Sequence, residues 1–148
     1  MTSAHVVYAT ITGNNEDVAD IITEHLEDLG IKTTETEISQ TDPAVFSDVD
    51  ICIVCPYTYD EGALPEEGMD FYDDLPDLDL KGKVFGVAGS GDTFYEEFYN
   101  LAVDKFTDAF KKTGATQGAE SVKINLEPDE DAITRLDQFV DTIVEKTK

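Results

Sequence analysis

The alternation of short apolar runs with segments of helical periodicity is the strongest constraint on the fold of this chain. The apolar runs at residues 49–55 and 84–89 are almost uninterrupted, which is typical of strands covered on both faces. A shorter run at residues 5–8 precedes them, the threonine-rich residues 31–38 suit an edge strand, and residues 121–126 form the last strand. Five alternations of strand and helix predict an α/β fold with one open parallel sheet and helices on both faces.

The helices between these strands are each expected to bury one apolar face. The first ends at Gly30, where glycine is typical of a helix C-cap, and another ends near Gly114. Pro128 is expected at the first position of the last helix. The apolar faces predicted for these three helices comprise Val18, Ile21, Ile22, Leu26 and Leu29, then Tyr95, Phe98, Ala102, Phe106, Ala109 and Phe110, and finally Ile133, Leu136, Val140, Ile143 and Val144.

Length and charge narrow the class of protein. The 148 residues fit one domain spanning residues 1–148. No apolar run approaches the roughly 20 residues that span a bilayer, and the N-terminus lacks the basic and apolar regions of a signal peptide, so we expect a cytoplasmic protein. The formal charge of −23 argues against nucleic acid and membrane as partners. It suits docking to basic protein surfaces, and an adaptation for solubility or salt explains it equally well.

The two cysteines, Cys52 and Cys55, have the C-x-x-C spacing of a redox dithiol or half a zinc site. Both lie in one apolar strand, however, and residues three apart in a strand point to opposite faces. The sequence therefore predicts core packing for both thiols and no metal site. No Ser-His-Asp or Cys-His arrangement is evident, and structural roles are expected for His5 and His25.

Three polar loops follow the strands at residues 5–8, 49–55 and 84–89. In an open parallel sheet these strands end at one edge, where ligands bind. The first loop contains Thr10, Ile11, Thr12, Gly13, Asn14 and Asn15, the second Thr58, Tyr59, Asp60 and Gly62, and the third Ser90, Gly91, Asp92 and Tyr95. Their convergence predicts a binding site.

The first loop has the properties of a phosphate site. A strand-to-helix turn leaves the first N–H groups of the helix unpartnered beside the positive end of the helix dipole, so a phosphate there needs no lysine or arginine. None is present. The loop is not a Walker motif, and Gly13 stands alone rather than in a dinucleotide fingerprint. A helix start capped by Thr12 or Asn14 is an equally good interpretation of this loop alone.

The other two loops add aromatic rings. Tyr59 and Tyr95 each follow a buried strand, and exposed aromatic rings in loops commonly stack on a partner. Two such rings at one sheet edge suit a flat ring system. Asp92 either accepts hydrogen bonds from ring N–H groups or caps the following helix.

These motifs together resemble those of the flavodoxin family. Residues 10–16, Thr-Ile-Thr-Gly-Asn-Asn-Glu, are similar to the flavodoxin phosphate loop, usually Ser/Thr-x-Thr-Gly-Asn-Thr-Glu. The second and third loops are similar to the two flavin-ring loops of that family. The resemblance covers the whole chain in the right order, and the last strand has no long insertion, as in short-chain flavodoxins.

The resemblance implies a doubly wound five-stranded sheet of order 2-1-3-4-5. It also implies non-covalently bound FMN and low-potential electron transfer between redox enzymes, by a monomeric carrier that is not itself an enzyme. Carried over by position, Thr10, Thr12, Asn14 and Asn15 hold the phosphate, with Thr58 nearby. Tyr59 and Tyr95 cover the two faces of the flavin ring, and the backbone around Asp92 meets its pyrimidine edge.

Two positions depart from the family pattern. Asn15 stands where threonine is usual, and its amide can still donate to a phosphate. Asp60 stands where many relatives have glycine. In the family the backbone carbonyl at this point turns toward the flavin on reduction, and aspartate makes that turn at some steric cost.

Three other functions remain open on the sequence alone. The first is an FMN-dependent NAD(P)H reductase, for which this acidic chain shows no basic residues to hold a second phosphate. The second is a flavodoxin-like activator of a ribonucleotide reductase. The third is a flavin-free receiver domain, which would need paired acids after the first strand and an aspartate after the third, where the chain has Thr10 and Pro56.

Overall fold

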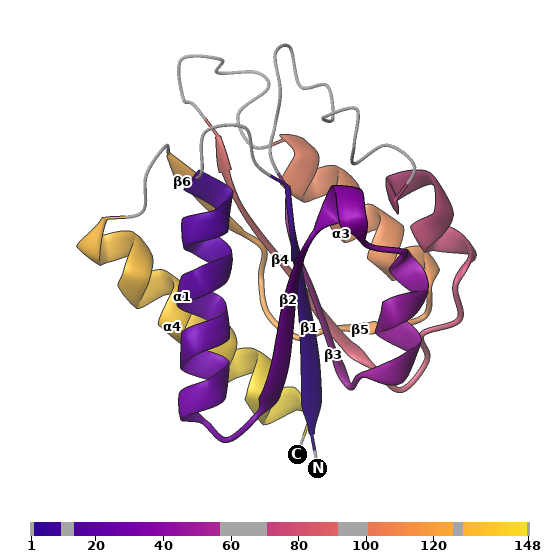
Figure 1. Cartoon of the computed structure of the whole chain (residues 1–148), viewed down its shortest axis with the longest axis horizontal. Coiled ribbons are helices and arrows are strands. Elements are labelled where there is room, and N and C mark those ends of the chain that lie inside the picture. The colour runs from indigo at the N-terminus through magenta and orange to yellow at the C-terminus, as the bar shows by residue number, and fades with distance from the viewer. Residues whose placement is uncertain (1, 10–13, 57–70, 92–100, 126–128, 148) are drawn as a thin grey trace.

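A parallel sheet occupies the centre of the molecule, with helices on both of its faces (Figure 1). The computed structural model describes residues 2–9, 14–56, 71–91, 101–125 and 129–147. The strands are β1 (Ser3–Tyr8), β2 (Lys32–Glu37), β3 (Ile51–Cys55), β4 (Val84–Gly91), β5 (Thr116–Gln117) and β6 (Val122–Asn125). The helices are α1 (Asn14–Asp28), α3 (Leu101–Lys112) and α4 (Glu130–Lys146), with 3-10 turns η1 (Ile38–Gln40), η2 (Pro43–Asp48) and η4 (Leu75–Asp77).

The strand order confirms the predicted topology. Neighbouring strands run in the order β2-β1-β3-β4-β5, and every pairing is parallel. The last strand predicted, at residues 121–126, corresponds to β6, and the short strand β5 before it was not predicted. The sheet therefore has six strands, because β5 pairs with the start of β4 while β6 pairs with its end. Gly118 lies between β5 and β6, and a Cβ atom there would come within 2.5 Å of Val84 Cγ1. The chain thus passes too close to β4 for a side chain at this point.

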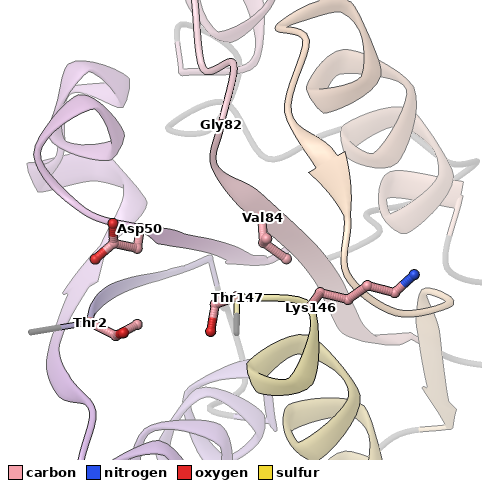
Figure 2. Close-up of a pocket in the computed structure, with 6 residues that line it drawn as sticks. All are labelled: Thr2, Asp50, Gly82, Val84, Lys146 and Thr147. Carbon is pink, nitrogen blue, oxygen red and sulfur yellow. The ribbon is translucent and has the colours of Figure 1, made fainter.

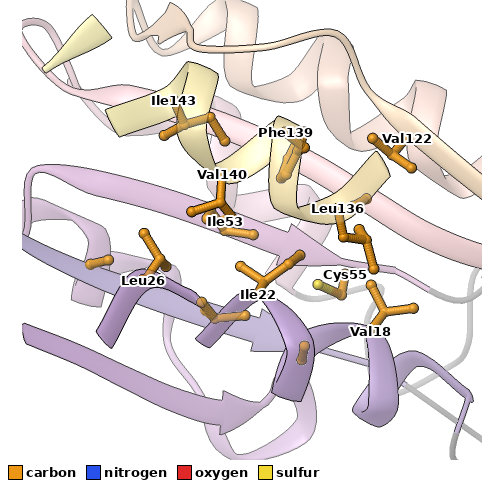
Figure 3. Close-up of a cluster of buried hydrophobic side chains, with 14 of the residues drawn as sticks. Val18, Ile22, Leu26, Ile53, Cys55, Val122, Leu136, Phe139, Val140 and Ile143 are labelled. Atoms are coloured by element: carbon orange, nitrogen blue, oxygen red, sulfur yellow. The ribbon is translucent and has the colours of Figure 1, made fainter. Parts of the chain in front are cut away.

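The two faces of the sheet pack in two separate hydrophobic clusters. The α1/α4 cluster, shown in Figure 3, contains Val18, Ile22, Leu26, Ile53, Cys55, Leu136, Val140 and Ile143 among others. The α3 cluster on the opposite face contains Phe46, Cys52, Val54, Phe71, Phe85, Phe106 and Phe110 among others. All five residues of β3 are buried, whereas β2 lies at the sheet edge with side chains that are exposed or part-exposed, as its threonine-rich sequence predicts.

Cys52 and Cys55 confirm the prediction that the C-x-x-C spacing is a packing feature. Both thiols are free and buried, Cys52 in the α3 cluster and Cys55 in the α1/α4 cluster. Burial raises the pKa of the Cys52 thiol to about 12 and that of Cys55 well above its usual value. The sheet therefore separates two thiols that are neither paired nor reactive.

Three details of the helices differ from the predictions. Leu29 is 44% exposed because α1 ends at Asp28 and the chain turns at Gly30, which has a φ of 83°. Ile133 is 40% exposed, because the buried face of α4 begins with Ala132 and not with Ile133. Helix α4 starts at Glu130, so Asp129 is its N-cap and the first helical position is not Pro128.

The Asp129 cap supplies a test of this helix boundary. Its carboxylate accepts a hydrogen bond of 2.8 Å from the Ala132 N–H. Loss of such a cap costs about 1 kcal/mol, so we expect Asp129→Ala to lower the free energy of unfolding by that amount in urea titrations. Asp131→Ala, which removes an exposed acid from the same first turn, is the control. Equal losses in both variants would contradict the assigned cap.

Candidate functional site

Three neighbouring strands end at the same edge of the sheet. Strand β3 lies between β1 and β4, and all three run parallel. Immediately beyond β1, the Ala9 N–H donates a hydrogen bond of 3.0 Å to the Cys55 carbonyl at the end of β3. The first two predicted loops therefore begin from adjacent points, as expected for a site at the carboxyl edge of a parallel sheet.

The structure places four of the predicted site residues in secondary structure. Asn14 and Asn15 begin α1, and Ser90 and Gly91 end β4 opposite Ile124 and Asn125 of β6. The remaining predicted site residues, Thr10, Ile11, Thr12, Gly13, Thr58, Tyr59, Asp60, Gly62, Asp92 and Tyr95, lie outside the described residues. Their roles stay predictions.

The start of α1 fits an anion at this edge. The helix begins at Asn14, a few residues after Ala9, and it runs for 15 residues. Its first N–H groups have no partners within the helix, and the dipole of a helix of this length places partial positive charge beside them. Glu16 and Asp17 lie in the first turn, where this partial positive charge stabilises their carboxylates. An anionic group would find its partners here in backbone amides rather than in basic side chains.

Tyr8 joins the end of β1 to the first turn of α1. Its hydroxyl hydrogen-bonds the Glu16 carboxylate, and the ring packs against the α1/α4 cluster. Burial, this hydrogen bond and the charges of Glu16, Glu37 and Glu35 raise the pKa of Tyr8 to about 12. This interaction links the end of β1 to the first turn of α1.

Glu35 is a half-buried acid on β2 that faces α1. Its Oε1 accepts a hydrogen bond of 2.6 Å from the Thr23 hydroxyl. Burial and a hydrogen bond with Asp20 raise the pKa of Glu35 to about 7, although the Thr23 hydrogen bond acts in the opposite direction. Sequence reasoning missed this pair of acids; its only signal was the alternation of threonine and glutamate along residues 33–37.

Both histidines make contacts that suit the structural roles expected from the sequence. His5 hydrogen-bonds Thr36 at 2.8 Å and meets the ring of Phe46 edge-on, and burial lowers its pKa. His25 links α1 to α4 through a contact of 2.8 Å between its Nε2 and Asp141. Within the described ranges, no three His, Cys, Asp or Glu side chains are arranged to hold a metal ion.

A cavity of about 350 Å³ lies at the opposite edge of the sheet (Figure 2). It is lined by Thr2, Asp50, Gly82, Val84, Lys146 and Thr147. Thr2 and Asp50 precede β1 and β3, and Val84 begins β4, so the cavity sits at the amino ends of the strands. It is therefore separate from the carboxyl edge where the predicted loops begin.

Comparisons with known proteins agree with the resemblance. Residues 6–139 match the family model described as flavodoxin. The chain is 62% identical to a short-chain flavodoxin associated with a PDU bacterial microcompartment, with a TM-score of 0.98 and 100% of both chains covered. It is 38% identical over 130 residues to probable flavodoxin 2 of Bacillus subtilis (strain 168), covering 87% of this chain and 85% of that protein.

A longer enzyme also contains a related segment. The chain is 32% identical over 152 residues to NADPH–cytochrome P450 reductase of Rattus norvegicus. The match covers 95% of this chain and 22% of that protein. A similar domain thus forms one part of a larger reductase.

The raised pKa of Glu35 predicts a specific pH dependence of stability. The pKa of Glu35 is about 7 in the folded chain against 4.5 for an ordinary glutamate, so its contribution is present at low pH and is lost as the pH rises through 7. A glutamine side chain at this position would keep a donor for Asp20 at every pH. We expect Glu35→Gln to match the wild-type stability at pH 5 and to exceed it by about 1 kcal/mol at pH 8, a value reduced for partial exposure.

Urea titrations at several pH values between 5 and 8 provide the measurement. Glu27→Gln is the control, because it removes the same charge from an exposed position of α1. If both variants changed stability equally across this range, a proton held at Glu35 would be ruled out.

Proposed function

This chain belongs to the flavodoxin family, whose function is electron transfer, and we propose that it carries electrons at low potential on non-covalently bound FMN. The main observation in favour of FMN is that α1 starts beside the ends of β1 and β3. That arrangement offers a phosphate the amides that have no partner within the helix, at the edge where flavin-binding loops are expected.

The phosphate would be held by the first loop. Thr10, Thr12, Asn14 and Asn15 supply hydroxyl and amide donors, and the backbone of Ile11 and Gly13 completes the turn, with Thr58 of the second loop nearby. Residues 10–16 contain no lysine or arginine. Affinity for the phosphate then depends on N–H and O–H dipoles, which makes the hydroxyls unusually important.

The flavin ring would lie between Tyr59 and Tyr95. Asp60 and Gly62 shape the second loop, and Asp92 with the backbone of Ser90 and Gly91 meets the polar edge of the ring. The bound flavin supplies the redox chemistry, whereas the chain binds, orients and surrounds it. The position of Ser90 and Gly91 supports this placement of the ring, because they end β4 at the same edge of the sheet as β1 and β3.

The negative charge of the chain determines whether the protein raises or lowers the reduction potential of a bound cofactor. Glu16 and Asp17 lie in the first turn of α1, and the whole chain has a formal charge of −23. Added negative charge at this edge is therefore electrostatically unfavourable. This effect lowers the reduction potential of a bound cofactor.

The proposed partners are redox proteins with basic docking surfaces. Related segments form part of longer reductases, and an acidic carrier is steered toward basic surfaces. We propose that the chain forms one domain and acts as a monomeric cytoplasmic carrier rather than as an enzyme. None of the helices that the structure describes could cross a membrane.

An absorbance spectrum of the purified protein tests the proposal directly. We expect a yellow protein with one flavin per chain, and a colourless protein that cannot be reconstituted with FMN would overturn it. Mixing the loaded protein with NADPH alone then distinguishes a carrier from a reductase. Rapid reduction without an added reductase would identify an enzyme instead.

Replacement of one hydroxyl of the first loop distinguishes recognition of the phosphate from recognition of the flavin ring. We expect Thr12→Ala to weaken FMN binding by about tenfold or more, the loss expected for a hydrogen bond to a charged group. Riboflavin, which lacks the phosphate, should bind equally well to both proteins. Thr2→Ala, at the opposite edge of the sheet, is the control. Equal losses for FMN and riboflavin in titrations of flavin fluorescence would refute a phosphate role for Thr12.

A further inference from the structure

The pairing of β3 with β4 stops just before the site. The described register ends with Val54 opposite Val87, and its continuation by two residues puts Pro56 opposite Gly89. Pro56 has no N–H group to donate to a strand ladder. The Cys55 carbonyl before it is already occupied by the Ala9 N–H of the neighbouring β1 segment. The chain therefore leaves the sheet at Pro56.

Gly89 allows Pro56 to lie unusually close to β4. A Cβ atom on Gly89 would lie 2.5 Å from the Pro56 carbonyl oxygen and 2.8 Å from Val103 Cγ2. Contacts of this length do not occur at real side chains, so any residue but glycine would displace its neighbours. The Val103 methyl group belongs to a side chain of α3 that can adjust. The Pro56 oxygen belongs to the backbone, and the proline ring fixes the φ angle that places its carbonyl carbon.

This contact joins the starting points of two loops. Pro56 directly precedes the segment predicted to carry Tyr59, and Gly89 lies two residues before the end of β4, after which Tyr95 is expected. A shift of Pro56 away from β4 would therefore change the spacing between the two starting points. A site that holds a flat ring between two loops is sensitive to such a change.

Because only the missing Cβ of Gly89 leaves room for the Pro56 carbonyl, we propose that Gly89 is a positioning residue that sets the width of the flavin-ring site. The inference rests on the proposed function, because it assumes that the ring lies between these loops. The close contacts of Gly89 are with Pro56, where the second loop starts, and with Val103 of α3. Its replacement should therefore affect FMN and riboflavin alike, in contrast to Thr12.

Gly86 of the same strand offers a matched control. A Cβ atom there would lie 2.5 Å from Ile143 Cδ1 and 2.6 Å from Phe139 Cζ. Both are side-chain atoms of α4, on the face of the sheet opposite α3. Alanine at this position strains the same strand without moving Pro56, so it separates general destabilisation from loop positioning.

The primary experiment compares flavin affinities and urea midpoints of the apoproteins. We expect Gly89→Ala to weaken FMN and riboflavin binding by about tenfold each, while Gly86→Ala lowers the urea midpoint but keeps affinity within about twofold of the wild type. Unchanged affinity in Gly89→Ala would overturn the proposal, as would a loss for FMN alone. Failure of the wild-type protein to bind flavin would instead overturn the proposed function.

A second variant distinguishes the two contacts of Gly89. Val103→Ala in the Gly89→Ala background removes the methyl contact and leaves the Pro56 carbonyl in place. We expect it to recover part of the urea midpoint but not the affinity for either flavin. Recovery of affinity together with stability would overturn the proposal, because core packing would then explain the defect. If Gly89→Ala alone does not fold, the flavin affinities of the double variant provide the test. If neither variant folds, Gly89 is required for the fold as a whole, and the proposed positioning role is overturned.

Discussion

The burial of β3 between β1 and β4 is the constraint on which the rest of the structure depends. All five of its residues are buried, with Ile53 in the α1/α4 cluster and Val54 in the α3 cluster. Each buried aliphatic side chain of this kind contributes about 1.5–3 kcal/mol, and a slip by one residue would exchange the two faces. The register is therefore strongly specified, and it determines where the strands end and the loops begin.

The close approach of α4 and Pro56 to β4 also affects the geometry of the binding edge. Two glycines in the strand remove side chains on opposite faces, so that α4 packs against Gly86 and Pro56 lies against Gly89. The first contact consolidates the core, whereas the second lies at the point where the chain leaves β3. A single strand thus links the packing of the helices to the geometry of the binding edge.

The acids near this edge are accommodated by specific contacts. The Glu16 carboxylate accepts the Tyr8 hydroxyl and lies at the favourable end of α1, and Glu35 is held by Thr23 and Asp20. These hydrogen bonds attach α1 to β1 and β2 although like charges are close together. The same negative charge that these contacts tolerate disfavours further negative charge at the edge, which suits a carrier of low-potential electrons.

Local patterns in the sequence determined the open parallel fold, the edge position of β2 and the opposite faces of Cys52 and Cys55, because each follows from the periodicity of adjacent residues. They did not predict the short sixth strand β5. They also located the loop motifs, whose residues are contiguous in the chain. The same patterns misplaced Leu29 and Ile133, since periodicity does not define where a helix ends or how it rolls on the sheet. Only the tertiary structure decided the contacts of Glu35 with α1 and of Gly89 with Pro56, because packing alone brings residues so distant in the chain together.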